Sequence, residues 1–340
     1  MKAEQLWAEF CLKKGMDIST PYKAWAFWGN GDKQDQLAQL VLEGKRFGTS
    51  SLYDAYKTEN ALHEIPKVGD YSIILDSNDD ALCVIRNYDV YIRPFNEVPP
   101  FHAYSEGEGD RSLEYWINVH RELFEEEAAK TGITFTEDSK VVCEKFTLEY
   151  TADQSSARDD ELLFIEPTMN YADEITAYRQ EMLDAGSSFD GCFSMKRMPD
   201  PQEYVDYCIG WANPSREAGG QGAWGNVLLV IRKSDMKMVG CMQVHSVLTQ
   251  WMKDFTGHVG YSVRPSERRK GYAKRMLAKA LDFLETFGFE EINVSCLPEN
   301  TASKKTIIAN GGEYVETVFL ERDNVHLEKY RIRVLLKACL

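Results

Sequence analysis

An apolar strand-like segment, a basic glycine turn and an amphipathic segment follow one another in the last third of the chain. The segment HVGYSVR leads through PSE into Arg268, Arg269, Lys270 and Gly271. Apolar residues then recur at helical spacing until Gly288, a stop signal; they are Ala273, Met276, Leu277, Ala280, Leu281 and Leu284. Glycine permits a close backbone approach, and a helix start presents N–H groups and positive potential. The order therefore favours a phosphate-binding turn, although a solvated basic helix start has the same residues.

The rest of this half alternates between strand-like and helical segments. The predicted strands are LLFIEP, EEINVSCL and a hairpin formed by VLLVIR and KMVGCMQVH. The predicted helices are YADEITAYRQEMLDAG, which Gly186 ends, PQEYVDYCIGWAN and TASKKTIIANGG. EYVETVFLER and VHLEKYRIRVLL are expected to form a closing hairpin.

The first half contains short strand-like runs separated by turn residues. YSIILDS, ALCVIRN and VYIRPF come first, and VVCEKFTLEY closes the half. Between them one amphipathic helix is predicted from Leu113, Trp116, Val119, Leu123 and Phe124. We expect a small β-barrel with a few helices. Residues 151–161, TADQSSARDDE, have no large apolar side chain and predict a linker, so we expect domains at 1–150 and 162–340.

Composition and charge limit the class of protein. The 340 residues are 44% hydrophobic and 27% charged, the balance of a folded, water-soluble protein. No apolar run has membrane-spanning length and the first residues lack a secretory apolar core, so we expect a cytoplasmic protein without membrane contact. The net charge is −15, of which −11 lies in residues 1–150, and this argues against counterion-driven binding of long nucleic acids. The eight cysteines show neither CxxC spacing nor a zinc-type cluster, so we expect buried free thiols and no metal.

The basic turn and its surroundings resemble the GNAT acetyltransferases. Arg268-x-x-Gly271-x-Ala273 matches the [Q/R]-x-x-G-x-[G/A] signature of that family, and Asn300-x-x-Ser303 followed by two glycines matches the second signature. The resemblance covers residues 162–340 and implies a mixed, splayed α/β sheet that holds acetyl-CoA between two parting strands. It also implies that the backbone of the turn binds the pyrophosphate, while the preceding strand and the second signature contact the pantetheine arm. The residues implied are Tyr261, Ser262, Val263, Arg268, Arg269, Lys270, Gly271, Tyr272, Ala273, Asn300 and Ser303.

The sequence offers several candidates for the general acid and the general base of such a reaction. Acetyl transfer requires an amine to lose a proton and the thiolate to regain one. Many GNAT enzymes place a tyrosine acid seven residues after the asparagine, where this chain has Ile307. The candidate bases are His258, Glu267 and His245, and the candidate acids are Tyr261 and Tyr330. For each of these residues, a purely structural role is the alternative. Beside the glycine-rich segment GGQGAWG, three tryptophans either line an acceptor pocket or belong to the core: Trp211, Trp224 and Trp251.

Two motifs of the first half carry polar groups. The segment from Gly44 to Ser50, GKRFGTS, offers cations and hydroxyls to an anion or a nucleotide edge, or simply ends a helix. The segment EGEGD from Glu106 to Asp110 brings three carboxylates together, which favours either a perturbed pKa, a cation contact or a solvated acidic turn. Together with WAFWG, PKVGDYSIILD and VVCEKFTLEY, these motifs resemble the ASCH family of PUA-like barrels over residues 25–150.

The ASCH resemblance implies recognition of RNA or modified nucleosides. One subgroup removes acetyl from the cytosine amino group with a lysine, a threonine and a glutamate. The matching positions here are Arg46, Thr49 and Glu106, and Lys45 is a neighbouring pocket candidate. Arginine stays protonated and is a poor proton acceptor, so this substitution favours binding over hydrolysis.

The two resemblances together predict an N-acetyltransferase that uses acetyl-CoA and an amine acceptor. Its ASCH domain is expected to bind a nucleoside, a nucleotide or an RNA end. In one alternative the ASCH domain is an active amidohydrolase on an acetylated nucleoside. In another, which Ile307 keeps open, the chain binds acetyl-CoA or RNA without turnover.

Overall fold

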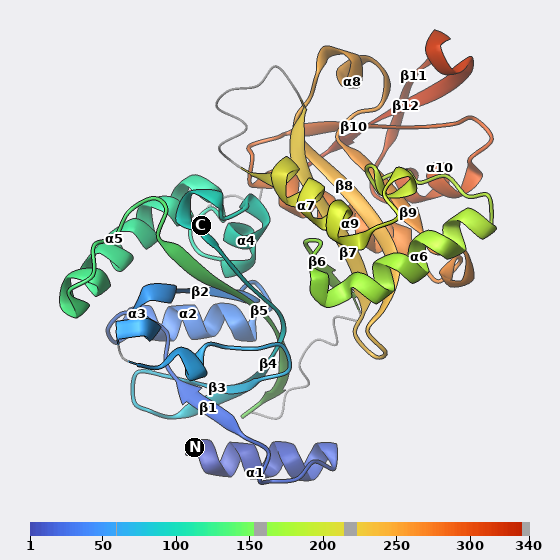
Figure 1. Cartoon of the computed structure of the whole chain (residues 1–340). Coiled ribbons are helices and arrows are strands. Elements are labelled where there is room, and N and C mark those ends of the chain that lie inside the picture. Colours follow the sequence, from blue (N-terminus) through green and yellow to red (C-terminus); the bar gives the residue numbers. More distant parts are fainter. Residues whose placement is uncertain (59, 153–161, 214–222, 335–340) are drawn as a thin grey trace. The chain divides into compact units, whose positions relative to one another are not determined.

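The computed structural model describes residues 1–58, 60–152, 162–213 and 223–334 (Figure 1). They form two compact units, Met1–Asp159 and Asp160–Leu340. Most of the predicted linker, residues 153–161, lies outside the described residues, as do Cys339 and the glycines at positions 219, 220 and 222. The other seven cysteines are buried free thiols. Among the described helices, none combines the length and apolar character that crossing a membrane requires.

The first unit contains one five-stranded sheet in the order β1-β3-β4-β5-β2. Its strands are β1 (Tyr22–Trp25), β2 (Gly48–Leu52), β3 (Tyr71–Leu75), β4 (Ala81–Pro94) and β5 (Lys140–Thr151). β1 runs parallel to β3, and the other neighbours are antiparallel. The two runs expected as separate strands, ALCVIRN and VYIRPF, form the single strand β4, because a bulge between Asn87 and Asp89 absorbs the irregularity without ending the pairing with β5.

Five helices surround this sheet: α1 (Ala3–Lys14), α2 (Asp32–Leu42), α3 (Tyr53–Thr58), α4 (Pro100–Glu106) and α5 (Leu113–Thr131). The neighbours Ile73 and Ile74 of β3 point to opposite faces, as side chains in a strand do. Ile73 packs with the α1 residues Leu6, Trp7 and Phe10. Ile74 packs with the α2 residues Leu37, Ala38 and Val41. Both faces of the sheet are therefore buried, and the predicted helix from Leu113 is confirmed as α5.

The second unit contains two sheet pieces. The four-stranded piece has the order β6-β7-β8-β9, and the three-stranded piece has the order β10-β12-β11. The strands are β6 (Leu162–Ile165), β7 (Trp224–Arg232), β8 (Lys237–Val247), β9 (Val259–Val263), β10 (Glu291–Cys296), β11 (Glu313–Leu320) and β12 (Val325–Arg333). β9 and β10 belong to different pieces and are bridged beside the start of β9, between Gly257 and Val294. The sheet is thus split between these two strands.

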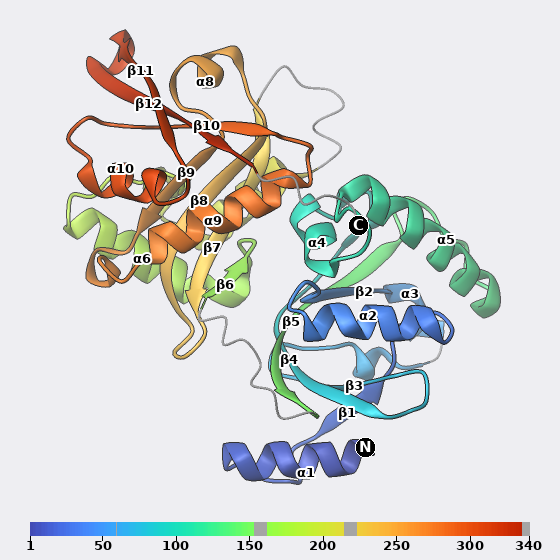
Figure 2. The same cartoon turned by 180° about the vertical axis from the view of Figure 1, so that it is seen from behind.

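Helices cover both faces of the four-stranded piece. The helices of this unit are α6 (Ala172–Asp184), α7 (Pro201–Ala212), α8 (Gln250–Phe255), α9 (Tyr272–Glu285) and α10 (Thr301–Ile308), and those that pack on the four-stranded piece are α6, α7 and α9. α6 and α7 lie in front in Figure 1, and α9 lies in front in the reverse view of Figure 2. The apolar face predicted for α9 is buried at Met276, Leu277 and Ala280. The expected two-domain α+β class is confirmed: a five-stranded sheet flanked by helices forms the first unit, and a split sheet with helices forms the second.

Candidate functional site

A cleft of about 1370 Å³ opens in the second unit where β9 and β10 part. Strand β9 lines one wall along its whole length, and the end of β10 with the start of α10 lines the other. The turn that leads from β9 into α9 lies beside the same cleft. The segments singled out by the two sequence signatures are therefore brought together around one cavity.

The turn before α9 has the geometry of an anion site. Gly271 is the N-cap of α9 and has φ of +81°, a conformation that side chains rarely adopt. A Cβ built there meets nothing within 4 Å, so the backbone faces open space. Helix α9 has 14 residues, and the N-terminus of such a helix attracts negative charge. Arg269 is exposed, lines the cleft and has no ion pair within the described residues. This geometry suits an anionic group.

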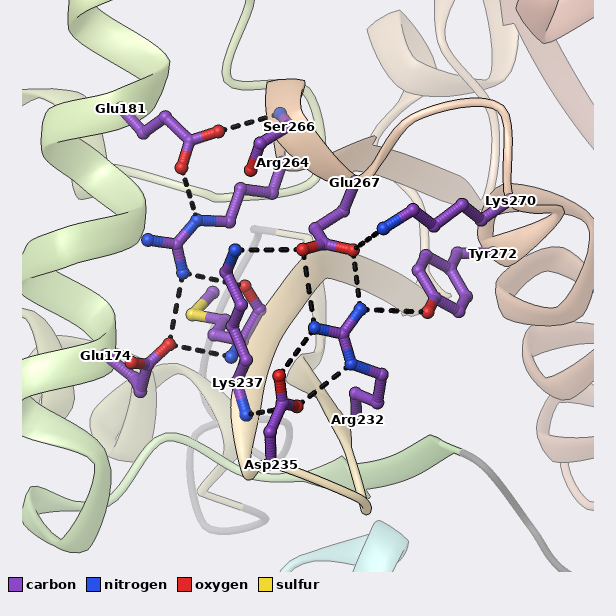
Figure 3. A network of polar contacts seen from close by, with 11 residues as sticks. Glu174, Glu181, Arg232, Asp235, Lys237, Arg264, Ser266, Glu267, Lys270 and Tyr272 are labelled. Carbon is purple, nitrogen blue, oxygen red and sulfur yellow. Dashed lines mark hydrogen bonds and ion pairs between the residues drawn. The ribbon is translucent and has the colours of Figure 1, made fainter.

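Two ion-pair clusters fix the turn in place (Figure 3). In the first, Arg264 binds Glu181 of α6 at 2.6 Å and Glu174 at 3.1 Å. Glu181 also accepts a hydrogen bond from the backbone N–H of Ser266 at 2.8 Å. These contacts tie the start of the turn to α6, which lies more than 80 residues earlier in the chain.

In the second cluster, three cations surround Glu267. They are Arg232 at 2.5 Å, Lys270 at 2.6 Å and Lys237 at 2.8 Å. Hydrogen bonds from Arg232, and then from Lys237 and Lys270, hold the pKa of Glu267 far below its usual value despite burial. A carboxylate that is so stabilised does not take up a proton near neutral pH. These contacts give Glu267 an anchoring role in the turn, and its role as a catalytic base stays a prediction.

The predicted acetyl-CoA residues line the cleft with one exception. Ten of them do so: Tyr261, Ser262, Val263, Arg268, Arg269, Gly271, Tyr272, Ala273, Asn300 and Ser303. The side chain of Lys270 turns to Glu267 instead, so the predicted cofactor contact of this residue is one of its backbone, and it stays a prediction. Arg268 donates to the Val263 carbonyl at 3.2 Å and to Ser187 at 2.8 Å. Its side chain therefore links the turn to the end of β9 and to the segment after α6.

Tyr261 lies on the cleft wall opposite α10. Its hydroxyl is 3.0 Å from the hydroxyl of Ser303. Burial raises the pKa of Tyr261 to about 12, with Ser303 acting in the opposite direction, so the phenol stays protonated at neutral pH. Ile307, at the position of the usual family tyrosine, is fully buried and does not line the cleft. Of the aromatic acids considered, Tyr330 does not line the cleft and donates to Glu328 at 2.7 Å.

The two candidate histidines have different surroundings. His258 lies outside the cleft lining, and its Nδ1 accepts a hydrogen bond from the backbone N–H of Asn293 at 3.1 Å. This contact links β10 to the segment before β9 and gives His258 a structural role, while its catalytic role stays a prediction. His245 lines the cleft, and its buried Nδ1 has no hydrogen-bond partner within the described residues. Burial, and then the charge of His258, lowers the pKa of His245 to about 4.

One aromatic side chain lies beside His245, and two more line the same cleft. Trp211 and Trp251 line the cleft, and the rings of Trp211 and His245 are 6.1 Å apart in an edge-to-face arrangement. Phe193 also lines the cleft, and the centroid of its ring is 4.6 Å from that of Trp211. Trp224 does not line it, because this residue begins β7 and is buried.

The first unit contains a second cavity, of about 510 Å³. Arg46 and Thr49 line it, as the sequence predicts for the ASCH pocket. Lys45 does not line it: its side chain is 60% exposed and pairs with Glu43 at 2.8 Å, so its place in the pocket stays a prediction. Glu106 lies behind the cavity wall rather than on it. The residues facing the cavity that sequence reasoning missed include Asn87, His120 and Glu144.

A buried charge cluster holds Arg46 and Glu106. Arg46 pairs with Glu106 at 2.7 Å and with Glu108 at 2.6 Å. Glu106 also accepts hydrogen bonds from Ser50 at 2.6 Å and from Trp116 at 2.8 Å. Burial alone would raise the pKa of Glu106, but the attraction of His120 and Arg46 holds it well below its usual value. Within the described residues, no three His, Cys, Asp or Glu side chains form a metal-binding group.

Comparisons with known proteins match each unit separately. The family model of the ASCH domain matches residues 23–150, and that of the acetyltransferase (GNAT) domain matches residues 163–313. A solved ASCH domain from Lactobacillus crispatus is 30% identical, with 43% of this chain and 92% of that chain covered and a TM-score of 0.40.

Solved acetyltransferases match the second unit at lower identity. The microcin C7 self-immunity acetyltransferase MccE, in complex with acetyl-CoA and AMP, is 14% identical. The match covers 52% of this chain and 94% of MccE, with a TM-score of 0.38. RimJ from Mycobacterium smegmatis, in complex with CoA-disulfide, is 17% identical. The match covers 51% of this chain and 81% of RimJ, with a TM-score of 0.40. A search of curated proteins finds no match to the chain.

Proposed function

The chain belongs to the ASCH family through residues 23–150 and to the GNAT acetyltransferase family through residues 163–313, and from this premise we propose its acceptor and its mechanism. The GNAT domain makes it an acyltransferase with acetyl-CoA as co-substrate. The proposed acceptor is an amine on a nucleoside, a nucleotide or an RNA end that the ASCH domain binds. The proposed domains are 1–150 and 162–340, joined by a linker at 151–161.

The cleft between β9 and β10 carries this proposal. The basic turn lies at the end of β9, and His245 follows Val244, which pairs with Val259 at the start of β9. Five residues of a strand extend over roughly 13 Å between their first and last Cα atoms. An extended pantetheine arm along β9 therefore leads from pyrophosphate at the turn to a thioester near His245. Asn300 and Ser303 flank the arm from α10.

His245 and Tyr261 are the proposed proton-handling residues. The thioester of acetyl-CoA supplies an activated acetyl group. The buried Nδ1 of His245 accepts a hydrogen bond from the attacking amine, and the imidazole is neutral at pH 7 because its pKa is lowered to about 4. Tyr261 holds its proton at neutral pH and donates it towards the departing sulfur, with Ser303 as its hydrogen-bond partner. Tyr261 of β9 is thus the proposed general acid, the role that a tyrosine at position 307 would have by the family pattern.

The ASCH domain is proposed to bind rather than to hydrolyse. A hydrolytic site needs a group that takes a proton from water. Arg46 stays protonated, and Glu106 is surrounded by donors that stabilise its charged form. We therefore expect no acetate release from N4-acetylcytidine.

The experiment is a thiol-release assay with acetyl-CoA and amines that include nucleosides, nucleotides and aminoacylated RNA ends. We expect release with at least one nucleoside-type amine. Tyr261→Phe should lower kcat about 100-fold, within the range of general acid catalysis, at unchanged acetyl-CoA affinity. Tyr314→Phe is the matched control, because Tyr314 is 57% exposed and lies outside the cleft lining. Acetyl-CoA binding without thiol release from any amine would contradict the transferase and support a non-catalytic binding protein.

A further inference from the structure

The floor of the cleft of the second unit carries two buried polar groups without partners. Cys241, Gln243 and His245 alternate along β8 and share one face of the sheet. This is the face that α7 covers, since Tyr204 of α7 lies 3.8 Å from the Cys241 sulfur (Figure 1). Gln243 lines the cleft and is more than nine-tenths buried, yet its side chain makes no hydrogen bond within the described residues. With Nδ1 of His245 it forms a floor suited to a polar molecule, because buried polar groups normally have partners.

The segment between α6 and α7 closes one end of this floor. Gly191 has φ of +77°, and a Cβ built on it would collide with the carbonyl group of Gly260 on β9. The carbonyl oxygen of Gly191 accepts a hydrogen bond from the Cys241 thiol at 3.4 Å. Gly260 is the register partner of Gln243. The segment therefore crosses β8 and β9 beside Gln243 and covers Cys241, which does not line the cleft.

This crossing brings one carboxylate, that of Asp190, to the end of the floor. Asp190 lines the cleft. Its carboxylate accepts a hydrogen bond from Ser188 at 2.7 Å and has no ion pair in the part of the chain that the structure describes. The other two carboxylates of the lining are paired, Glu267 with three cations and Asp323 with Arg322 at 2.9 Å. Asp190 is thus the lining carboxylate that can receive a cation.

Charge distinguishes the two kinds of amine that a nucleoside-type acceptor can offer. An aliphatic amine is protonated at pH 7, because alkylammonium groups have pKa values of about 8 to 10. The amino group of a nucleobase shares its lone pair with the ring, so it is uncharged and a weak nucleophile. Asp190 attracts the first kind and gains no charge attraction from the second. The pKa of His245, lowered to about 4, also favours an amine that needs little activation.

We propose that Asp190 and Gln243 select an acceptor whose reactive amine is aliphatic and arrives as an ammonium group. The ammonium group lies over Gln243, between Asp190 and His245, which follows Gln243 by about 7 Å along β8. Asp190 accepts hydrogen bonds from it, and the amide of Gln243 binds the polar atoms beside it. Asp190 acts on the affinity for the acceptor and is a specificity-determining residue. The inference rests on the proposed nucleoside-type acceptor and adds which of its amines reacts.

The test is a calorimetric titration of the full chain, in the presence of CoA at pH 7, with thymidine and with 5′-amino-5′-deoxythymidine. These nucleosides differ in one group, a hydroxyl or an ammonium. We expect the amine to bind about tenfold tighter, as a hydrogen bond to a charged group allows, and Asp190→Asn to remove the difference. Asp190 is exposed, so its variant should fold. Asp184→Asn is the matched control, because Asp184 is an exposed residue at the end of α6 outside the cleft lining.

A thiol-release assay with acetyl-CoA gives a second measurement. 5′-Amino-5′-deoxythymidine should be acetylated, whereas 2′-deoxycytidine, whose amine is on the base, should not. Asp190→Asn should raise KM for the aliphatic amine about tenfold and leave kcat unchanged, because the residue acts on binding. Asp184→Asn should change neither constant.

The outcomes separate this inference from the proposed function. Thiol release with 2′-deoxycytidine alone, or equal affinity of the wild type for the two thymidine nucleosides, would contradict the inference and leave the nucleoside-type acceptor standing. Tighter binding of the amine that persists in Asp190→Asn would overturn the role of Asp190. Absence of binding by both nucleosides would contradict this inference and the nucleoside-type acceptor together.

Discussion

Individual side chains of the same type take different roles in this molecule because their neighbours differ. His245 ends one predicted strand and His258 begins another, yet of these two only His245 lines the cleft, with a ring nitrogen that has no hydrogen-bond partner within the described residues. Glu267 lies beside the cofactor turn, where three cations hold its charge. The local sequence identifies these residues as candidates, but their partners come from distant strands and helices. Arg232 is 35 residues away from Glu267, for example, so no local pattern predicts the pairing.

The state of His245 leads to a pH prediction. Its pKa is lowered to about 4, so the imidazole stays neutral from pH 5 to 7 and does not titrate in that window. His245→Gln should therefore lower kcat/KM for the amine by about 100-fold, and by the same factor at each pH. His326→Gln is the control, since His326 lies outside the cleft lining. If the wild-type rate instead has an inflection near pH 6.5 that His245→Gln removes, the assigned environment of His245 is wrong.

The turn between β9 and α9 is the element on which the proposed cofactor site depends. The sequence predicts its conformation well, because Gly271, the helical spacing of α9 and the stop at Gly288 are local signals. The bulge in β4 and the clusters around Glu267 and Arg264 are not predicted, because they depend on which strands and helices become neighbours. In the ASCH cavity, Arg46 and Thr49 follow from a sequence motif, whereas Glu144 appears only as one residue of an apolar strand.

Glu267 should make the stability of the second unit depend on pH. Its pKa is lowered in the folded state from an ordinary value of 4.5, so its stabilisation is present above that pH and is lost as the pH falls below it. Glu267→Gln leaves three cations facing a neutral group and should destabilise the fold by about 3 kcal/mol at pH 7. The difference from wild type should shrink between pH 5 and pH 2.

Urea unfolding followed by tryptophan fluorescence measures this effect. Glu313→Gln is the matched control, because Glu313 is exposed at the start of β11. A constant difference between Glu267→Gln and wild type across this pH range would show that the carboxylate of Glu267 is not stabilised by its three neighbours.

At the scale of the whole molecule, the chain forms two compact units, and a cavity lies in each of them. The acidic charge of residues 1–150 disfavours long polyanions, whereas a single nucleoside or a chain end carries little charge to repel. The fusion therefore fits an acceptor that is small or terminal. Both family assignments were predictable because their motifs are local, but the acceptor is not, since it depends on the shape of the cavities.

The central claim is that the turn at Gly271 binds the pyrophosphate of acetyl-CoA, and calorimetric titration with acetyl-CoA tests it most directly. Gly271→Glu places a carboxylate at this turn. Gly288→Glu is the matched control, because both glycines have positive φ and open space around a Cβ, and Gly288 lies outside the cleft lining. Each substitution should cost about 1–2 kcal/mol of backbone strain. We predict that acetyl-CoA binds the wild type and Gly288→Glu with equal affinity and does not bind Gly271→Glu. Equal binding by all three proteins, or no binding by the wild type, would contradict the account.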